Sequence, residues 1–427
     1  MASPDPSAFQ PIVLSLPSFS PSLAVEVIPY GLTIHRILVN GDGKTHDLLI
    51  GPEGPQEHGE LRRFMNTIVG RYSNRIPTGD FTLEKNGITS QLHVDGNQDA
   101  EVQLHGGHDG FDKRVFAVVD PSDFSAYSLF SDSEKEQIIG LMPAAAIFKL
   151  TSPDKDEGYP GQLDLEVLVA LVQPGSAPKS KIDGEYQLGS VIIVYRAKVE
   201  GEDGKKTVTP VNLTQHWGFN LDASLASGAA GATPGVLTQN LTIKASDTLQ
   251  LQPNGLATGN YDPTEGTHHE HKEKPIGDKY PEAGYDSFYL FERQPSKQPS
   301  SLVALNSLPE LNEVRALTEP STVDEVPVEL SSKETGIRIS FETNQPGVQF
   351  YTGNGLSKDS GSRKKIHGGS GNAGDGYEPK AGAFLEFHEP LAAWQHPWGK
   401  THGDTLLTSD ELYNNYTKLN VYFKRKD

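Results

Sequence analysis

The sequence predicts an all-β protein, built as a large antiparallel sandwich or barrel with loop insertions. Apolar residues recur at every second position, most clearly over residues 163–169, 191–199 and 337–341. Successive side chains of a strand point to opposite faces, so this period indicates half-buried strands. Turn signals such as Asn86-Gly87 and Asp203-Gly204 separate many of the runs. The 43 glycines and 30 prolines also favour a turn-rich β protein over a helical bundle.

Shorter apolar runs predict further strands along most of the chain. They cover residues 23–39, 46–50, 80–84, 88–94, 115–119, 146–150, 241–245, 285–292, 347–352 and 382–388. Helical periodicity is weak throughout, and we expect one short helix over residues 409–416, with Ser409 as its N-cap. We interpret residues 1–22 as an N-terminal extension and residues 23–427 as a single domain.

Polar or glycine-rich stretches interrupt the strand pattern and are expected to be surface loops. They are residues 121–140, 223–235, 262–282, 294–335 and 353–380. The last one contains Gly369-Ser370-Gly371-Asn372-Ala373-Gly374, which matches the dinucleotide-binding pattern. No helix is predicted after it to receive a pyrophosphate, so a flexible loop is the better interpretation. His268, His269, Glu270 and His271 could bind a metal, but this stretch is likewise better interpreted as a solvated loop.

The composition excludes several classes of function. Lys and Arg total 37 against 56 Asp and Glu, a net charge of −19, which argues against binding to nucleic acid or to an anionic membrane. With 0 cysteines, the chain has no disulfide, catalytic thiolate or cysteine-ligated metal. No secretory signal and no apolar run long enough to span a membrane is visible, so we expect a cytoplasmic protein. No exposed apolar stripe stands out, so a monomer is expected.

Histidine and carboxylate chemistry remains, and it is concentrated in a series of short segments. In chain order these are Gly70-Arg71-Tyr72-Ser73-Asn74-Arg75, Leu104-His105-Gly106-Gly107, Gly110-Phe111-Asp112-Lys113, Glu157-Gly158-Tyr159-Pro160-Gly161, Asn212-Leu213-Thr214-Gln215-His216-Trp217-Gly218, Gly284-Tyr285-Asp286, Gln349-Phe350-Tyr351-Thr352-Gly353-Asn354 and Phe384-Leu385-Glu386. Each is weak alone, but in this order the set resembles the aldose 1-epimerase, or galactose mutarotase, family from about residue 23 to residue 423.

The resemblance implies a β-supersandwich with a sugar site in an open cleft. It implies interconversion of the α and β anomers of a free aldohexose, galactose or glucose, with no metal or organic cofactor. By position, Glu386 matches the family's general base and His216 its general acid. The matching sugar-binding positions are Asn74, Arg75, His105, Asp286 and Gln349. The chain departs from the family pattern at Gln215, Trp217, Gly218, Ser287, Phe387 and His388, which leaves the sugar preference open.

The chemistry of these residue types is consistent with that implication. Opening a hemiacetal removes a proton from the O1 hydroxyl while another reaches the ring oxygen O5, tasks that suit a carboxylate and an imidazolium. We therefore expect an acidic neighbourhood that raises the pKa of His216, with the two groups flanking the ring. Trp217 or another aromatic ring is a candidate to pack against an apolar face of the sugar.

Three other functions remain open. A hexose-6-phosphate 1-epimerase would need a basic phosphate cradle, which this acidic chain does not suggest. A glycoside hydrolase would pair Asp286 with Glu386 and leave His216 without a role. A non-catalytic sugar-binding protein would need the binding residues alone.

Overall fold

The computed structural model describes the chain except for residues 1–3, 19, 21, 42, 62–63, 175–181, 228–231, 293–300, 320–325, 398–402 and 426–427. Its α-helices are α1 Glu57–Glu60, α2 Asp132–Leu141 and α3 Glu313–Thr318. Its strands are β1 Ile12–Ser15, β2 Leu23–Ile28, β3 Thr33–Gly41, β4 Lys44–Asp47, β5 Ile68–Val69, β6 Arg75–Pro77, β7 Gly79–Lys85, β8 Ile88–Val94, β9 Val102–Leu104, β10 Ala117–Val119, β11 Ala145–Ser152, β12 Gln162–Val172, β13 Glu185–Glu200, β14 Val208–Pro210, β15 Thr214–Gln215, β16 Gly218–Phe219, β17 Asn240–Ile243, β18 Ala245–Leu251, β19 Ala257–Pro263, β20 Lys274–Pro275, β21 Asp286–Phe291, β22 Leu302–Ala304, β23 Val328–Ser331, β24 Ile337–Thr343, β25 Gly347–Tyr351, β26 Ala383–His388, β27 Leu406–Thr408 and β28 Glu411–Lys424. The predicted all-β class is confirmed.

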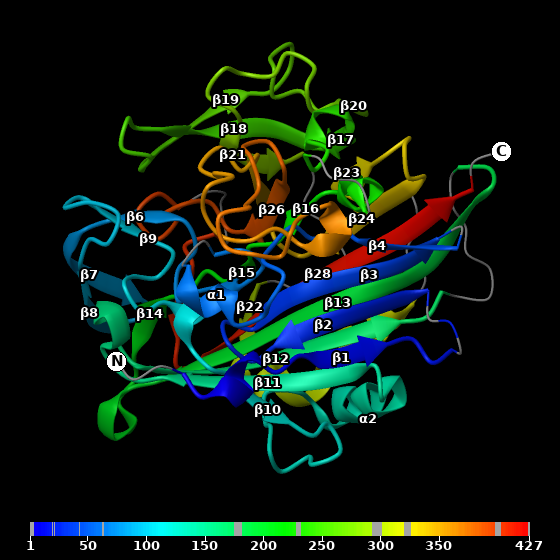
Figure 1. Cartoon of the computed structure of the whole chain (residues 1–427). Coiled ribbons are helices and arrows are strands. Elements are labelled where there is room, and N and C mark those ends of the chain that lie inside the picture. Colours follow the sequence, from blue (N-terminus) through cyan, green and yellow to red (C-terminus); the bar gives the residue numbers. More distant parts are fainter. Residues whose placement is uncertain are drawn as a thin grey trace.

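Two sheets enclose the main core. A ten-stranded sheet runs in the order β10-β11-β12-β13-β28-β24-β23-β17-β20, with β22 added beside β28. The four-stranded sheet β1-β2-β3-β4, blue in Figure 1, lies across its long strands. Alternate residues of β12, such as Leu165 and Val167, share one apolar core with Val25 and Val27 of β2. The period-two pattern of the sequence therefore marks the face that packs between the sheets.

A six-stranded sheet carries much of the candidate site. Its order is β16-β26-β25-β21-β18-β19, and β18 and β19 form a hairpin that projects at the top of Figure 1. The short pairs β6-β9 and β15-β5 lie outside both large sheets. These pairs bring segments from the first half of the chain to β26 and β25 of the second half.

The expected loop over residues 121–140 is wrong, because it contains most of helix α2. Ser131 and Glu134 form a capping box at its start, a signal that the sequence Ser131-Asp132-Ser133-Glu134 carries. Ile138 of α2 and Val314 of α3 pack on the outer face of the ten-stranded sheet. Beneath them, buried Arg196 of β13 binds Glu134 at 3.0 Å. Both faces of β12 and β13 are consequently buried in their central parts.

The expected helix over residues 409–416 is also wrong. Residues Glu411–Lys424 form β28, which pairs with β13 on one side and β24 on the other. Its later residues alternate, with Leu419, Val421 and Phe423 in the core. A central position between two long strands supplies ladder hydrogen bonds that outweigh a weak local helix signal.

Two of the insertions are anchored more firmly than their composition suggests. In the loop over residues 353–380, Lys364 is fully buried and its Nζ donates to Asp47 Oδ2 at 2.7 Å and to the carbonyls of His35 and Leu49. In the loop over residues 262–282, His271 is also buried and lies 3.2 Å from Tyr289 Oη. The prediction that this histidine is solvated is therefore wrong.

Strand β1 lies within residues 1–22, where it pairs with β2. The division of the chain at residue 22 stays a prediction.

Part of the insertion over residues 223–235 and part of that over 294–335 lie outside the described residues. Among the described residues, no helix has the length and apolarity needed to cross a membrane.

Candidate active site

Three adjacent strands of the six-stranded sheet present Glu386, Gln349 and Asp286. Gln349 of β25 lies directly opposite Glu386 of β26. On the other side of β25, Asp286 of β21 pairs with Tyr351, so it is a diagonal neighbour of Gln349. The Gln349 Nε2 donates to Asp286 Oδ1 at 2.6 Å. The sheet register alone thus aligns three polar side chains on one face.

The pair β6-β9 supplies Asn74, Arg75 and His105. Asn74 and His105 flank the paired residues and have left-handed φ values of 63° and 53°. They are joined twice: Asn74 N–H donates to His105 Nδ1 at 3.2 Å, and His105 N–H donates to the Asn74 carbonyl at 3.1 Å. Next to them, Gly106 has a φ of 81°, and a Cβ there would lie 2.0 Å from the Gly70 carbonyl oxygen. Glycine is therefore required beside His105.

Arg75 bridges this pair of strands to the six-stranded sheet. Its Nη2 lies 3.6 Å from Asp286 Oδ2, and its Nε donates to Gln98 Oε1 at 3.0 Å. Both charged side chains are partly exposed, at 21% for Arg75 and 39% for Asp286. They therefore stand at the mouth of the site, where they can meet an incoming polar ligand.

His216 enters the site from the connection between β15 and β16. Its backbone is held on both sides, with His216 N–H donating to the Thr67 carbonyl at 2.9 Å and Asn66 N–H donating to the His216 carbonyl at 2.8 Å. Its Nε2 lies 3.3 Å from Glu386 Oε1. The two side chains are almost completely buried, so they form the floor of the site.

The residues predicted for the site line one cleft of about 210 Å³, together with three residues that the sequence analysis did not single out. The predicted ones are Asn74, Arg75, His105, His216, Asp286, Gln349 and Glu386, and the additional ones are Phe64, Leu104 and Tyr351. Leu104 and Tyr351 lie within segments that carry the family resemblance. Phe64, whose ring centroid is 4.6 Å from that of His105, has no such signal in the sequence.

Burial changes the protonation expected for the pair. It lowers the pKa of His216 to about 4, and His388 nearby lowers it further. Burial, assisted by the charge of Asp286, raises the pKa of Glu386 well above its usual value. The prediction that acidic neighbours raise the pKa of His216 is therefore wrong, because the cost of burying a charge outweighs the attraction of the carboxylate. The site therefore favours a protonated Glu386 beside a neutral His216.

His105, His216 and Glu386 place potential metal ligands within 4.8 Å of one another. A metal-bound histidine usually donates from its other ring nitrogen. His105 instead accepts at Nδ1 from the Asn74 N–H, so its neutral ring carries the proton on Nε2. Metal binding at either nitrogen would disrupt this arrangement. The geometry therefore fits hydrogen bonding to a polar ligand better than metal binding.

Trp217 does not line the cleft, contrary to expectation. It is 1% exposed and packs in the main core with its ring centroid 5.4 Å from that of Phe219. As the neighbour of His216 in extended backbone, it points to the opposite side. Phe64 and Tyr351 are aromatic side chains that do line the cleft.

The cleft thus combines an adjacent carboxyl group and imidazole with hydrogen-bonding side chains, an arrangement that suits acid–base chemistry on a polar ligand. The aldose 1-epimerase family model matches residues 19–177 and 185–419, so the chain belongs to the aldose 1-epimerase family. It is 27% identical to galactose mutarotase of Sus scrofa over 404 residues, covering 93% of this chain and 91% of the relative. Aldose 1-epimerase of Escherichia coli (strain K12) is 24% identical, with the same coverage.

Solved structures support the fold. An aldose epimerase homologue from C. elegans superposes with a TM-score of 0.66 at 18% identity, covering 97% of this chain and 99% of that chain. Galactose 1-epimerase from Lactobacillus acidophilus gives a TM-score of 0.61 at 18% identity, covering 96% and 98%. The galactose mutarotase fold expected from the sequence is therefore confirmed.

Proposed function

We propose that this protein is an aldose 1-epimerase that interconverts the α and β anomers of free aldohexoses such as glucose and galactose. The observation that carries the proposal is the 3.3 Å approach of His216 Nε2 to Glu386 Oε1 at the floor of the cleft. The substrate is a neutral sugar, and the proposal uses no metal or organic cofactor.

The reacting oxygens of the sugar explain why these groups lie side by side. O1 and O5 are bonded to the same carbon, so a base acting at O1 and an acid acting at O5 can be neighbours. In the proposed step Glu386 accepts the O1 proton while His216 donates to O5, which breaks the C1–O5 bond and leaves an aldehyde. The 3.3 Å contact therefore supports an adjacent acid–base pair rather than two groups on opposite sides of the ring.

The pair needs only one proton in total. Ring opening starts with ionised Glu386 and protonated His216, and ends with protonated Glu386 and neutral His216. Rotation about C1–C2 and the reverse transfers then close the other anomer. Burial favours the second protonation state, in which neither group is charged. We infer that the buried floor of the cleft stabilises the protonation state that accompanies the open-chain intermediate.

The remaining predicted residues are suited to orient the sugar. Asp286 can accept from hydroxyl groups, while Arg75 and Gln349 can donate to them. His105 offers its Nε2–H as a donor because Nδ1 is already occupied by Asn74. These contacts would hold C1 against the acid–base pair rather than take part in proton transfer.

The cleft favours a neutral sugar over a phosphorylated one. Among the described residues that line it, Arg75 is the only permanently charged cation, and it is already paired with Asp286. A phosphate cradle needs several donors directed at one anion. A glycoside hydrolase would pair Asp286 with Glu386. The contact of His216 with Glu386 would have no role in that mechanism.

The direct test is polarimetry, or NMR, of freshly dissolved α-galactose and α-glucose with and without protein. We expect equilibration to be faster than in buffer for at least one sugar. Faster anomer equilibration of glucose 6-phosphate alone would identify a hexose-6-phosphate 1-epimerase. Binding without any acceleration would select a non-catalytic sugar-binding protein, and either result would overturn the proposal.

A further inference from the structure

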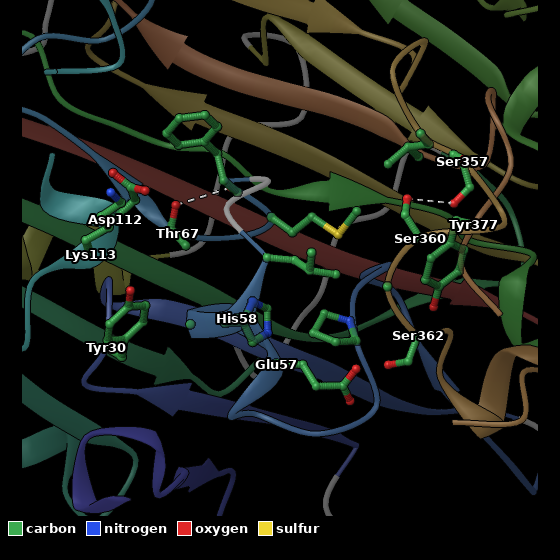
Figure 2. A pocket seen from close by; sticks show the side chains of 17 residues that line it. Tyr30, Glu57, His58, Thr67, Asp112, Lys113, Ser357, Ser360, Ser362 and Tyr377 are labelled. Atoms are coloured by element: carbon green, nitrogen blue, oxygen red, sulfur yellow. Dashed lines mark hydrogen bonds between the residues drawn. The ribbon is translucent and has the colours of Figure 1, made fainter. Parts of the chain in front are cut away.

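Arg75 has a set of neighbours that differs from the rest of the cleft wall. Phe64 lines both the cleft and a second cavity, which Figure 2 shows with Tyr30, Thr67 and Tyr377 around it. Arg75 lines the cleft but is not among the residues around that cavity. Its neighbours come instead from β21, from the segment between β8 and β9, and from the hairpin of β18 and β19. These elements determine how its side chain can face a ligand.

The guanidinium of Arg75 is contacted by three residues. Its Nη2 lies 3.6 Å from Asp286 Oδ2, and its Nε donates to Gln98 Oε1 at 3.0 Å. The third neighbour is Gly255, where a Cβ atom would lie 2.6 Å from Arg75 Cδ and 2.8 Å from Arg75 Nε. Neither Gln98 nor Gly255 is among the described residues that line the cleft. Their effect on a ligand is therefore exerted through Arg75.

Gly255 lies in the turn of the hairpin of β18 and β19, which reaches toward the pair β6-β9 (Figure 1). Its φ of 82° is left-handed, and its N–H donates to the Gln252 carbonyl at 2.9 Å. Next to it, Asn254 Nδ2 donates to Glu101 Oε2 at 3.2 Å, which ties the turn to the segment before β9. Strand β18 pairs with β21, which begins at Asp286. The hairpin therefore joins the two elements that flank Arg75.

Gln98 lies in the segment between β8 and β9, and its backbone is held at the start of β9. The N–H groups of Asn97 and Gln98 both donate to the Val102 carbonyl at 3.2 Å. An arginine carries its N–H donors in one rigid plane. With Nε on Gln98 and Nη2 beside Asp286, two points of that plane are fixed, so its rotation is fixed as well. The orientation of the remaining N–H groups follows from these two contacts.

We propose that Gln98 and Gly255 are positioning residues for Arg75. Gln98 sets the rotation of the guanidinium, and the turn at Gly255 occupies the space into which the side chain could otherwise swing. This inference rests on the proposed function, in which Arg75 donates to sugar hydroxyls. A side chain that is already held in its binding geometry loses less conformational entropy when a ligand binds. Both residues should therefore strengthen sugar binding and leave proton transfer by Glu386 and His216 nearly unchanged.

The test measures KM and kcat for mutarotation of glucose and galactose. Gln98→Leu removes the acceptor for Arg75 Nε, and we expect KM to rise about three- to tenfold, the value of one hydrogen bond, with kcat within about twofold. Gln98→Glu keeps an acceptor and should recover most of the loss. Gln91→Leu is the matched control, because Gln91 is also exposed and bonds to Thr82 on the hairpin of β7 and β8. It should leave KM and kcat unchanged.

Gly255→Ala tests the hairpin turn, because its methyl group would meet the Arg75 side chain. The end of an arginine side chain can move, so we expect the variant to fold, Arg75 to be displaced and KM to rise by a similar factor. Gly87→Ala is the matched control: Gly87 has a similar φ of 76° in the turn between β7 and β8, and a Cβ atom there meets nothing within 4 Å. It reproduces the backbone strain alone and should leave KM unchanged.

A double-mutant cycle shows whether the effects pass through Arg75. In an Arg75→Met background, Gln98→Leu and Gly255→Ala should cause no further rise in KM. Melting temperatures check that each variant is folded. The same rise with and without the guanidinium, a loss confined to kcat, or an unaltered KM in both single variants would overturn the positioning role while leaving the proposed function intact. Absence of mutarotation by the wild-type protein with every sugar would overturn both.

Discussion

Glu386 of β26 faces His216, which lies two residues before the start of the partner strand β16. Strand β16 pairs with β26 so that Gly218 faces Phe384, and the same register continued by two residues brings His216 opposite Glu386. Side chains at such positions are within contact distance, as the 3.3 Å separation shows. The proposed acid–base pair is thus a product of sheet register, and its spacing is as rigid as the sheet.

The first prediction concerns the proposed base. Glu386→Gln keeps the volume and burial of the side chain but removes its ability to accept a proton. We expect kcat to fall by about 100-fold or more, the scale of a lost general base. Polarimetry at saturating sugar measures it, with exposed Glu282→Gln as the matched control. A folded Glu386→Gln variant with an unaltered rate would refute the assigned role.

The second prediction concerns His216 and pH. Its lowered pKa of about 4 means that the free enzyme takes up a further proton there only as the pH falls through that value. Because the reaction uses one proton shared by the pair, kcat/KM should decline below about pH 4. His216→Gln should lower the rate severely and abolish this acidic limb. If the decline of kcat/KM below about pH 4 persists in His216→Gln, another titrating group causes it.

The third prediction separates binding from chemistry. Asp286 lies at the mouth of the cleft and bonds to Gln349, away from the acid–base pair. Asp286→Ala should therefore raise KM by about tenfold, the value of one charge-assisted hydrogen bond, while kcat changes less. Initial rates over a range of sugar concentrations decide this. A loss confined to kcat would contradict the role.

The fourth prediction concerns the support of His105. Asn97 donates to the carbonyls of Leu104 and Gly107 at 2.9 and 2.7 Å and accepts from the Leu104 N–H at 2.6 Å. Asn97→Ala should release this loop, destabilise the fold by roughly 1–3 kcal/mol, and lower kcat/KM. Asn97→Asp keeps the acceptor and should recover part of the loss. Equal kinetic effects of Asn97→Ala and Asn97→Asp would argue against positioning through these bonds.

The fifth prediction concerns acid stability. Burial lowers the pKa of His216, His367 and His388 to about 4 and that of His58 to about 3. The unfolded chain binds these protons near pH 6.5 and the folded chain does not. The free energy of unfolding should therefore fall as the pH decreases from about 6.5 to 4, by about 1.4 kcal/mol per unit for each group.

Glu386, with its raised pKa, contributes in the opposite direction, since its stabilising effect is lost as the pH rises through the folded value. Burial raises the pKa of Glu26 and Glu313 as well, and the four histidines outweigh these carboxyl groups. Denaturant unfolding at pH 7, 6 and 5 measures the trend. Constant stability over this range would show that these histidines are accessible to protons in the folded state.

The strand-rich class, the family resemblance and the seven predicted residues that meet in the cleft could all be inferred from the sequence. These follow from local signals: period-two runs such as residues 163–169, and short motifs such as Leu104-His105-Gly106-Gly107. Local signals also bear on the two corrected elements: the capping box at Ser131 is typical of the start of helix α2, whereas the weak helix pattern at residues 409–416 gives way to strand β28.

Only the tertiary structure decided the protonation of His216 and Glu386, the placement of Trp217 in the core, and the cavity beside Phe64. Protonation depends on desolvation by segments distant in the chain. The cavity depends on how Lys364 anchors one loop against Asp47, more than 300 residues away. Burial and long-range contacts are properties of the packed chain, and no local pattern of residues encodes them.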